Sequence, residues 1–573
     1  MPKAKIKNKR RAPAPEAPPH RSKTWLYGLL FAAAFAAALF AYEPALAGPF
    51  VFDDLYLPFT GQEYANAPLR VWMTNVRPLL MLSFWANYKF SGMQPFSYHF
   101  VNLLLHVLTS GLAFLIARRL LERAGEKGFA RDATAAFAGG LFLLHPLQTE
   151  SVAYVASRSE LLSVFFFYGA FALFLYRRKD AISWVESVGV LLLFAAAANT
   201  KEHTAVLPLL LLLTDYYWNP GFSLRGIRRN WRVYGLIAIA GAFALRMVWG
   251  IIRHADTAGF SMKEFTWYQY FYTQCRVIWL YIRMFFLPYG LNVDHDFPIS
   301  FTVMQHGAVF ALAALMAAAA AALYYRKRFP LASYGFFVFL LLLAPTSSIV
   351  PIADPVAERR MYLPMIGLLL VVAEFLRRWK VSRGVVAALI AGVLVFAAFT
   401  TYARSLVWSS DLALWHDSAS KSPLKSRPQF QLAFALFAQG RCAESLPHYA
   451  AAAVRAPSDY RLFIDWAVAL DCAGRGEEAL EKLRKAMTIQ NSAQVHALFG
   501  DLYRKHGKRD DALRELSEAE RIDPNFELTY LYRGALYHQE GDIKSAANEY
   551  RRALSLNPAS EAARQGLASL QSR

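Results

Sequence analysis

The chain of 573 residues is 56% hydrophobic and 18% charged, and its mean hydropathy is +0.24. These values exclude an ordinary soluble protein and predict a polytopic membrane protein. The formal net charge is +20. All of this charge except +1 lies before Ser426, in the apolar part of the chain. The excess of Lys and Arg in cytoplasmic loops and attraction to anionic lipids explain such a charge, so it does not indicate a nucleic-acid partner.

Residues 1–24 are rich in Lys, Arg and Pro, which predicts a disordered cytoplasmic tail. The apolar run Trp25–Ala41 and the sequence ALA at 45–47 resemble a signal peptide with its cleavage site. We expect an uncleaved first span instead, because cleavage would remove the anchor directly before the acidic pair Asp53 and Asp54.

Further apolar runs predict about eleven spans in all, including the first. The runs lie near 98–117, 133–147, 160–176, 182–198, 204–218, 233–252, 304–325, 331–350, 361–376 and 384–402. Basic clusters in five loops share the side of the tail, which predicts a cytoplasmic N-terminus and an outer C-terminus. The segment Trp267–Leu287 carries Arg276 and Arg283, so we expect an interfacial or re-entrant helix there.

The last third of the chain repeats with a period of about 34 residues. Small and aromatic residues recur at tetratricopeptide spacing, as in Gly534, Tyr537 and Ala546. We therefore divide the chain into the tail (1–24), a transmembrane domain (25–403), a linker (404–425) and a repeat domain (426–573) of four repeats plus a capping helix. Cys442 and Cys472 lie in adjacent repeats, where they either pair on an oxidising side or stay buried free thiols.

The predicted topology gathers ionisable residues on the outer face, where such groups usually mark a site. They are Asp53, Asp54, His145, Glu150, Arg158, Glu160, Lys201, Glu202, Glu358, Arg359 and Arg360. The Arg359–Arg360 pair runs against the positive-inside trend, which a phosphate ligand would justify; salt bridges among loops are the alternative. His99, Asn102 and His106 share one helix face, but a metal needs more ligands, so we predict none.

Moving a sugar from a polyprenyl phosphate to a hydroxyl needs a carboxylate that orients or deprotonates the acceptor. It also needs cations that stabilise the departing phosphate. Asp53 and Asp54 supply the first requirement, and Arg359 and Arg360 the second. Adjacent residues of an extended loop point opposite ways, so we expect one Asp to face the acceptor and the other to fix the loop. Solvated charge beside a span is the alternative.

Several motifs together resemble the transmembrane and tetratricopeptide-repeat O-mannosyltransferases of the GT-C glycosyltransferase superfamily, in a bacterial-type member. In family order they are FVFDD at 50–54, RPL at 77–79, HFVNLLLH at 99–106, HPLQTESVAYVASRSELL at 145–162, TKE at 200–202 and ERRMYLP at 358–364. The resemblance covers almost everything after the tail. Val76 before RPL and SRSE at 157–160 depart from the usual family pattern and leave the sugar open.

The resemblance implies a GT-C fold, a polyprenyl- or dolichyl-phosphate-linked hexose donor, inversion at the anomeric carbon, and catalysis by Asp53 and Asp54. We expect Arg359 and Arg360 to bind the donor phosphate, and we expect no cofactor besides the donor. A requirement for a divalent metal stays open. Expected substrate-binding residues are Arg77, His99, His145, Glu150, Arg158, Glu160, Lys201, Glu202, Glu358 and Tyr362.

The expected enzyme lies in a bacterial inner membrane with periplasmic repeats. It moves a hexose, mannose by family analogy, to Ser/Thr hydroxyls of exported polypeptide that the repeats recruit. One alternative is a non-enzymatic scaffold that binds envelope proteins. The other is a GT-C enzyme with a lipid or glycan acceptor.

Overall fold

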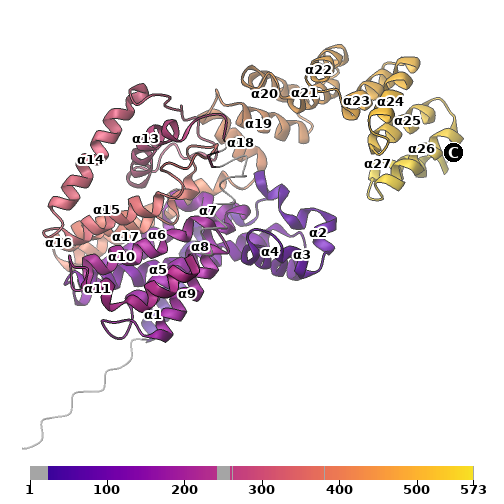
Figure 1. The fold of residues 1–573 in the computed structure, drawn as a ribbon. Helices are drawn as coiled ribbons and strands as arrows, with labels where there is room; N and C mark the ends of the chain where they lie inside the picture. The colour runs from indigo at the N-terminus through magenta and orange to yellow at the C-terminus, as the bar shows by residue number, and fades with distance from the viewer. Residues whose placement is uncertain (1–23, 242–258, 261, 380, 572–573) are drawn as a thin grey trace, which may run out of the picture.

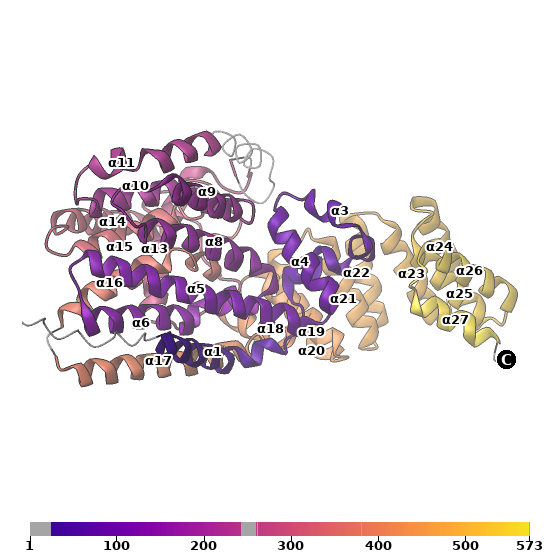
Figure 2. The same cartoon turned by 90° about the horizontal axis from the view of Figure 1, so that it is seen from below.

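The computed structural model describes residues 24–241, 259–260, 262–379 and 381–571, so residues 1–23 of the predicted tail lie outside the described residues. Helices make up all the regular elements of the described segments, which confirms the all-α fold. A bundle of long helices forms one part, and a chain of short helical pairs projects from one end of it (Figure 1). The view from below shows the same bundle and array end to end (Figure 2).

Ten of the predicted apolar runs coincide with helices. These are α1 (Thr24–Leu46), α5 (Pro95–Arg123), α6 (Gly128–Leu144), α8 (Arg158–Leu175), α9 (Trp184–Ala198), α10 (Leu207–Trp218), α14 (Ala308–Tyr324), α15 (Pro330–Leu343), α16 (Met365–Arg378) and α17 (Arg383–Leu406). The remaining run, 233–252, ends outside the described residues. Helix α4 (Pro78–Ser91) and the short helices α2 (Gln62–Asn66), α3 (Leu69–Met73) and α11 (Arg225–Arg229) lie between those ten helices in the sequence.

Five helices are long and apolar enough to cross a membrane in the described part of the chain. They are Gly28–Leu46, Pro95–Arg123, Val155–Leu175, Gln305–Tyr324 and Arg383–Leu406; Trp184–Ala198 and Pro330–Leu343 are shorter apolar helices. These helices suit a membrane protein, while the count of eleven crossings stays a prediction. Helix α13 (Trp267–Phe286) is not among them; its Arg276 and Arg283 lie over the rings of Phe297 and Tyr289 at 4.5 and 4.4 Å.

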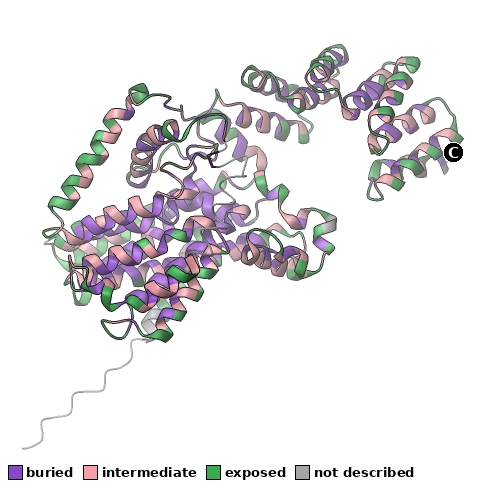
Figure 3. Cartoon of the chain, viewed as in Figure 1, coloured by how far each residue is buried: buried purple, intermediate pink, exposed green. Residues whose placement is uncertain are grey.

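Close helix contacts build the core of the bundle. A Cβ on Gly335 of α15 would lie 2.5 Å from the carbonyl oxygen of Gly367 on α16, so only glycine permits this approach. Helix α1 packs against α17, where the Ser405 hydroxyl donates to the Ala41 carbonyl at 2.9 Å. Buried residues concentrate between such helices, whereas α14 is mostly exposed (Figure 3).

Four helical pairs and a final helix form the array. They are α19 (Ser426–Ala438) with α20 (Cys442–Arg455), α21 (Tyr460–Cys472) with α22 (Gly476–Ile489), α23 (Ala493–Lys505) with α24 (Arg509–Ile522), α25 (Glu527–Gln539) with α26 (Ile543–Leu556), and α27 (Glu561–Gln571). A Cβ on Gly500 would lie 2.5 Å from the Leu516 side chain, which explains the small residue there. A disulfide joins Cys442 to Cys472, so it links the first two repeats.

The predicted linker contains α18 (Asp411–Lys421), which packs on α19. Near it, short helices from distant parts of the sequence meet. They are η1 (Phe52–Tyr56), η3 (Pro146–Gln148), α7 (Thr149–Ala153), η4 (Val155–Ser157), η5 (Glu202–Val206) and η7 (Glu358–Met361). Helix η1 contacts η4, and both η3 and α7 contact η7. This junction therefore collects most of the ionisable residues that the sequence singles out.

Candidate functional site

The acidic loop, residues 49–57, is pinned to η4 by one of its two carboxylates. Asp54 is fully buried and accepts backbone N–H bonds from Ala156 at 2.7 Å, Val51 at 3.3 Å and Val155 at 3.4 Å. Burial raises the pKa of Asp54 to about 7, against the opposing effect of these bonds. The Asp54 carboxylate therefore fixes the loop.

Its neighbour Asp53 is exposed. The Asp53 backbone N–H donates to the Tyr154 hydroxyl at 3.0 Å, which holds this residue in place from the main-chain side. Burial, followed by the charges of Asp53 and Asp54, raises the pKa of Tyr154 well above its usual value, so this phenol stays neutral. The Asp53 carboxylate is thus the one of the pair that a second molecule is able to reach.

A buried ion pair lies beside the acidic loop. Glu150 on α7 is 1% exposed and accepts a bond at 2.9 Å from the Arg359 backbone N–H, while its second oxygen pairs with the Arg359 guanidinium. Burial opposes the charged form of Arg359, but Glu150 raises the Arg359 pKa above its usual value. The Arg359 side chain remains 26% exposed. Arg359 is therefore a fixed cation with an accessible part.

The next residues of this segment have different partners. The Arg360 guanidinium donates to the carbonyl oxygens of Pro355 at 2.9 Å and Asp354 at 2.6 Å, so it holds its own turn together. Glu358 is fully buried; it accepts from the Asn292 backbone N–H and lies 3.0 Å from the His295 ring. The structure brings Arg359, rather than Arg360, to the Glu150 carboxylate.

Charged residues at the N-terminal ends of α4, α8 and η5 form a second group. Lys201 pairs with Glu160, and Arg77 forms two bonds to Glu202 at 2.9 and 2.8 Å. His203 lies 3.3 Å from Glu160 as well, and burial lowers the pKa of its ring to about 4, which keeps the ring neutral. His203 is absent from our predicted site residues, although the stretch NTKEH at 199–203 contains it.

Arg158 is fully buried, and its guanidinium has hydrogen-bond partners within the protein. Its guanidinium donates to the side-chain oxygens of Asn102 and Asn87, each at 2.9 Å, and lies 4.6 Å from the Phe84 ring. These contacts join α8 to α5 and α4. The expected role of Arg158 in substrate binding stays a prediction.

The remaining predicted residues are also enclosed. His99 lies 3.2 Å from the Gly48 carbonyl, the His145 ring donates to the Phe285 carbonyl at 2.8 Å, and the Tyr362 hydroxyl lies 2.9 Å from the His106 ring. These contacts join segments that are distant in the sequence, and the roles of His99, His145 and Tyr362 in substrate binding stay predictions. The described residues contain no group of three or more His, Cys, Asp or Glu that suits a metal ion.

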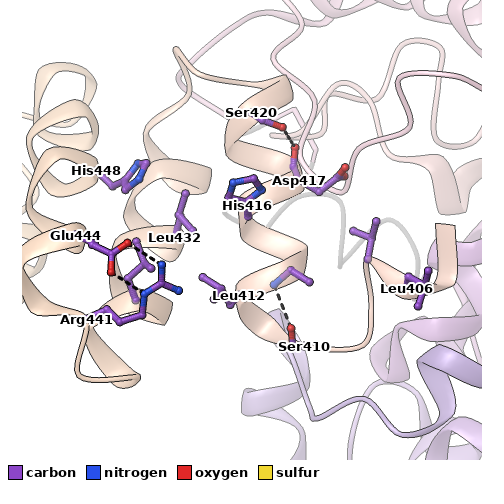
Figure 4. A pocket seen from close by; sticks show the side chains of 13 residues that line it. Leu406, Ser410, Leu412, His416, Asp417, Ser420, Leu432, Arg441, Glu444 and His448 are labelled. Atoms are coloured by element: carbon purple, nitrogen blue, oxygen red, sulfur yellow. Dashed lines mark hydrogen bonds and ion pairs between the residues drawn. The ribbon is translucent and has the colours of Figure 1, made fainter. Parts of the chain in front are cut away.

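A cavity of ≈ 680 Å³ opens between α18 and the first repeat. In the close-up, His416 and His448 approach from opposite sides, and the Arg441–Glu444 ion pair borders the space (Figure 4). None of the predicted site residues lines it. The cavity and the acidic loop are therefore separate features of this junction.

Known proteins match the repeats and, in one case, a larger part of the chain. A family described as TPR repeat matches residues 500–541, and one described as tetratricopeptide repeat matches residues 529–560. The chain is 22% identical to a protein O-mannosyl-transferase of Caenorhabditis elegans over 72% of this chain and 60% of that protein. It is 38% identical to a protein O-mannosyl-transferase of Drosophila melanogaster over 24% of this chain and 15% of that protein.

A mouse protein O-mannosyl-transferase is 28% identical over 30% of this chain and 20% of that protein. The chain thus spans less than two thirds of the length of each of these relatives. Among solved structures, a thermophilic TPR protein of Thermus thermophilus is 21% identical with a TM-score of 0.26, covering 32% of this chain and 96% of that one.

Proposed function

We propose that this protein is a membrane glycosyltransferase of GT-C type that transfers a hexose to hydroxyl groups of a polypeptide. The observation that carries the proposal is the accessible Asp53 carboxylate on a loop that the buried Asp54 fixes beside the Glu150–Arg359 pair. The names of the relatives support the same reaction class. The alternative of a scaffold gives no reason for an exposed carboxylate on a residue whose backbone N–H is bonded to Tyr154.

In the proposed reaction, the donor is a polyprenyl-phosphate-linked hexose and no other cofactor takes part. The oxygen of a Ser or Thr hydroxyl attacks the anomeric carbon from the face opposite the phosphate. The Asp53 carboxylate accepts the proton of that hydroxyl. The bond between that carbon and the phosphate oxygen breaks, the phosphate keeps the electron pair, and the configuration inverts. Arg359 stabilises the negative charge of the departing polyprenyl phosphate.

The remaining predicted residues divide by accessibility. Arg77 and Glu202 are each about one-third exposed, at 36% and 27%, and are the best placed to contact the sugar or phosphate directly. Burial opposes the charged form of Lys201 and lowers its pKa, and Glu160 only partly offsets this effect. We assign Lys201 and Glu160 to holding η5 against α8.

The proposed setting is a membrane with the acidic loop and the repeats on its outer face. The Cys442–Cys472 disulfide supports an oxidising location for the repeats. Such arrays bind extended polypeptide, so we propose that the repeats recruit the acceptor. A bacterial inner membrane stays a prediction, because the relatives named above are animal proteins.

The test uses purified full-length protein with polyprenyl-phosphate hexose donors and, in separate reactions, a protein extract or a lipid extract as acceptor. We expect the wild-type enzyme to transfer labelled hexose to the protein extract and Asp53→Asn to transfer none. Labelled lipid without labelled protein would show that the acceptor is a lipid rather than a polypeptide. No transfer from any donor in the set, by protein that is folded, would contradict the enzyme and favour the scaffold.

A further inference from the structure

A contact between the acidic loop and the repeat array begins at Phe52. Its backbone has φ of +56°, in the left-handed region that residues with a side chain rarely occupy. The Phe52 ring stacks on Tyr154 at 5.9 Å and meets the Trp415 ring edge-on at 5.5 Å. On the array side, the Arg427 guanidinium lies 5.3 Å from the centre of the Phe52 ring.

Arg427 is itself held rigidly. Its guanidinium donates to both carboxylate oxygens of Asp294 at 2.6 Å and to those of Asp354 at 3.0 and 3.1 Å. A planar guanidinium bound in this way is fixed in orientation as well as position. The first helix of the array therefore presents an oriented cation to the ring of Phe52.

Lys425 provides an internal comparison. It pairs with the same carboxylates, Asp294 and Asp354, and donates to the His295 carbonyl at 3.3 Å. The cation–π contact of Phe52 is made by Arg427, two residues further on. Lys425 and Arg427 thus share the anchoring of the array, while Arg427 alone of the two reaches the acidic loop through that contact.

The geometry links Arg427 to Asp53. A left-handed residue with a side chain persists only where its surroundings hold it, and here the surroundings are Tyr154, Trp415 and Arg427. Asp53 follows Phe52 directly, so the backbone conformation of Phe52 sets the direction of the Asp53 carboxylate. Release of the Phe52 ring would let this segment relax and turn the carboxylate away.

We propose that Arg427 is a positioning residue for the acidic loop, so that the first repeat belongs to the catalytic centre as well as to the recruitment of the acceptor. The effect of Arg427 on the conformation of the acidic loop does not depend on the reaction. The importance of Arg427 for catalysis rests on the proposed function. An array that only captured polypeptide would need no such contact with Phe52.

The test compares wild-type protein with Arg427→Gln and, as the matched control, Lys425→Gln, all at full length. Amide hydrogen exchange is followed in residues 49–57 and, as a check of the fold, in the repeats. We expect exchange at the Val51 and Asp53 amides to rise about tenfold in Arg427→Gln and to change less than about twofold in Lys425→Gln, with the repeats unchanged in both. Equal exchange in the two variants would overturn the proposal.

Kinetics provide the second measurement. We expect Arg427→Gln to lower kcat about 10- to 100-fold with the KM for the polypeptide nearly unchanged, because a displaced base affects the chemical step. A rise in that KM alone would overturn the proposal and leave the array as a recruiting surface. If wild-type protein transfers no sugar, the proposed function fails, whereas the exchange measurement still decides the role of Arg427.

Discussion

Asp53 and Asp54 are neighbours in the chain but lie in opposite environments, since Asp54 is fully buried among backbone N–H donors and Asp53 is exposed. A carboxylate that accepts three N–H bonds has little capacity left for an acceptor hydroxyl. The exposed neighbour keeps that capacity and is held at its backbone by Tyr154. Substitutions of Asp53 and of Asp54 are therefore expected to affect different properties of the protein.

Replacing Asp53 should remove activity without harming the fold. We expect Asp53→Asn to lower the rate of hexose transfer about 10²- to 10⁴-fold, because the amide cannot accept the hydroxyl proton. Thermal unfolding should stay within about a degree of wild type, since surface substitutions usually have small effects. Asp510→Asn, at a side chain that is 95% exposed in the array, serves as the control. Normal transfer by Asp53→Asn would remove this carboxylate from the mechanism.

Asp54 should make stability depend on pH. Its pKa is raised by burial to about 7 in the folded protein, above the ordinary value of 3.8. The folded state therefore binds more protons between these values, so the stability from this group is present below about pH 4 and is lost as pH rises towards 7. The full effect is on the order of 4 kcal/mol.

Thermal unfolding of the purified protein between pH 4 and pH 8 tests this expectation. The melting temperature of wild type relative to Asp54→Asn should fall as pH rises through this range and level off above about 7. A difference that grows with pH would show that the folded protein favours the ionised carboxylate. The variant should also exchange amide hydrogens in the acidic loop faster, because one bonding oxygen is lost.

The Glu150–Arg359 pair allows structure and chemistry to be separated. Arg359→Gln leaves the buried Glu150 carboxylate without its cation, which should destabilise the protein by about 3–5 kcal/mol. Glu150→Gln with Arg359→Gln removes both charges and should recover most of that loss. Transfer should remain low in the double variant, since the departing phosphate still lacks its cation. Full transfer by the double variant would show that Arg359 acts only on stability.

The disulfide predicts a thiol count. Denatured but unreduced protein should expose one reactive thiol, Cys275, and reduction should raise the number to three. Replacing Cys442 and Cys472 by Ser should lower the stability of the array by about 2–4 kcal/mol, with Cys275→Ser as the control. Three thiols before reduction would restore the alternative of free cysteines and remove the support for an oxidising location.

The helices of this protein could be predicted from sequence because a membrane span must be a continuous apolar run. Helices α5 and α17 stand out for that reason. The repeats could be predicted because small residues recur wherever two helices approach closely, as Gly534 does beside Tyr550. Both signals are local, since each depends on residues that lie close together in the chain.

The site could be predicted only in part, because charge alone does not reveal a partner. Arg158 and Arg359 look equivalent in sequence, but Arg158 bonds to Asn102, 56 residues away, whereas Arg359 pairs with Glu150, 209 residues away. The contact of Arg427 with Phe52 spans the two domains and leaves no local pattern. Such pairings follow from the packing of distant helices and loops.

The packing of α1 on α17 has a consequence for synthesis of the chain. The Ala41 carbonyl and the Ser405 hydroxyl that bonds to it are 364 residues apart, so the ribosome needs about 20 to 70 s to make the second partner after the first. During that time α1 is able to pack on α5, but the face that α17 covers has no partner. A nascent chain that stops after α16 would therefore leave an unfinished bundle for the cell to shield or degrade.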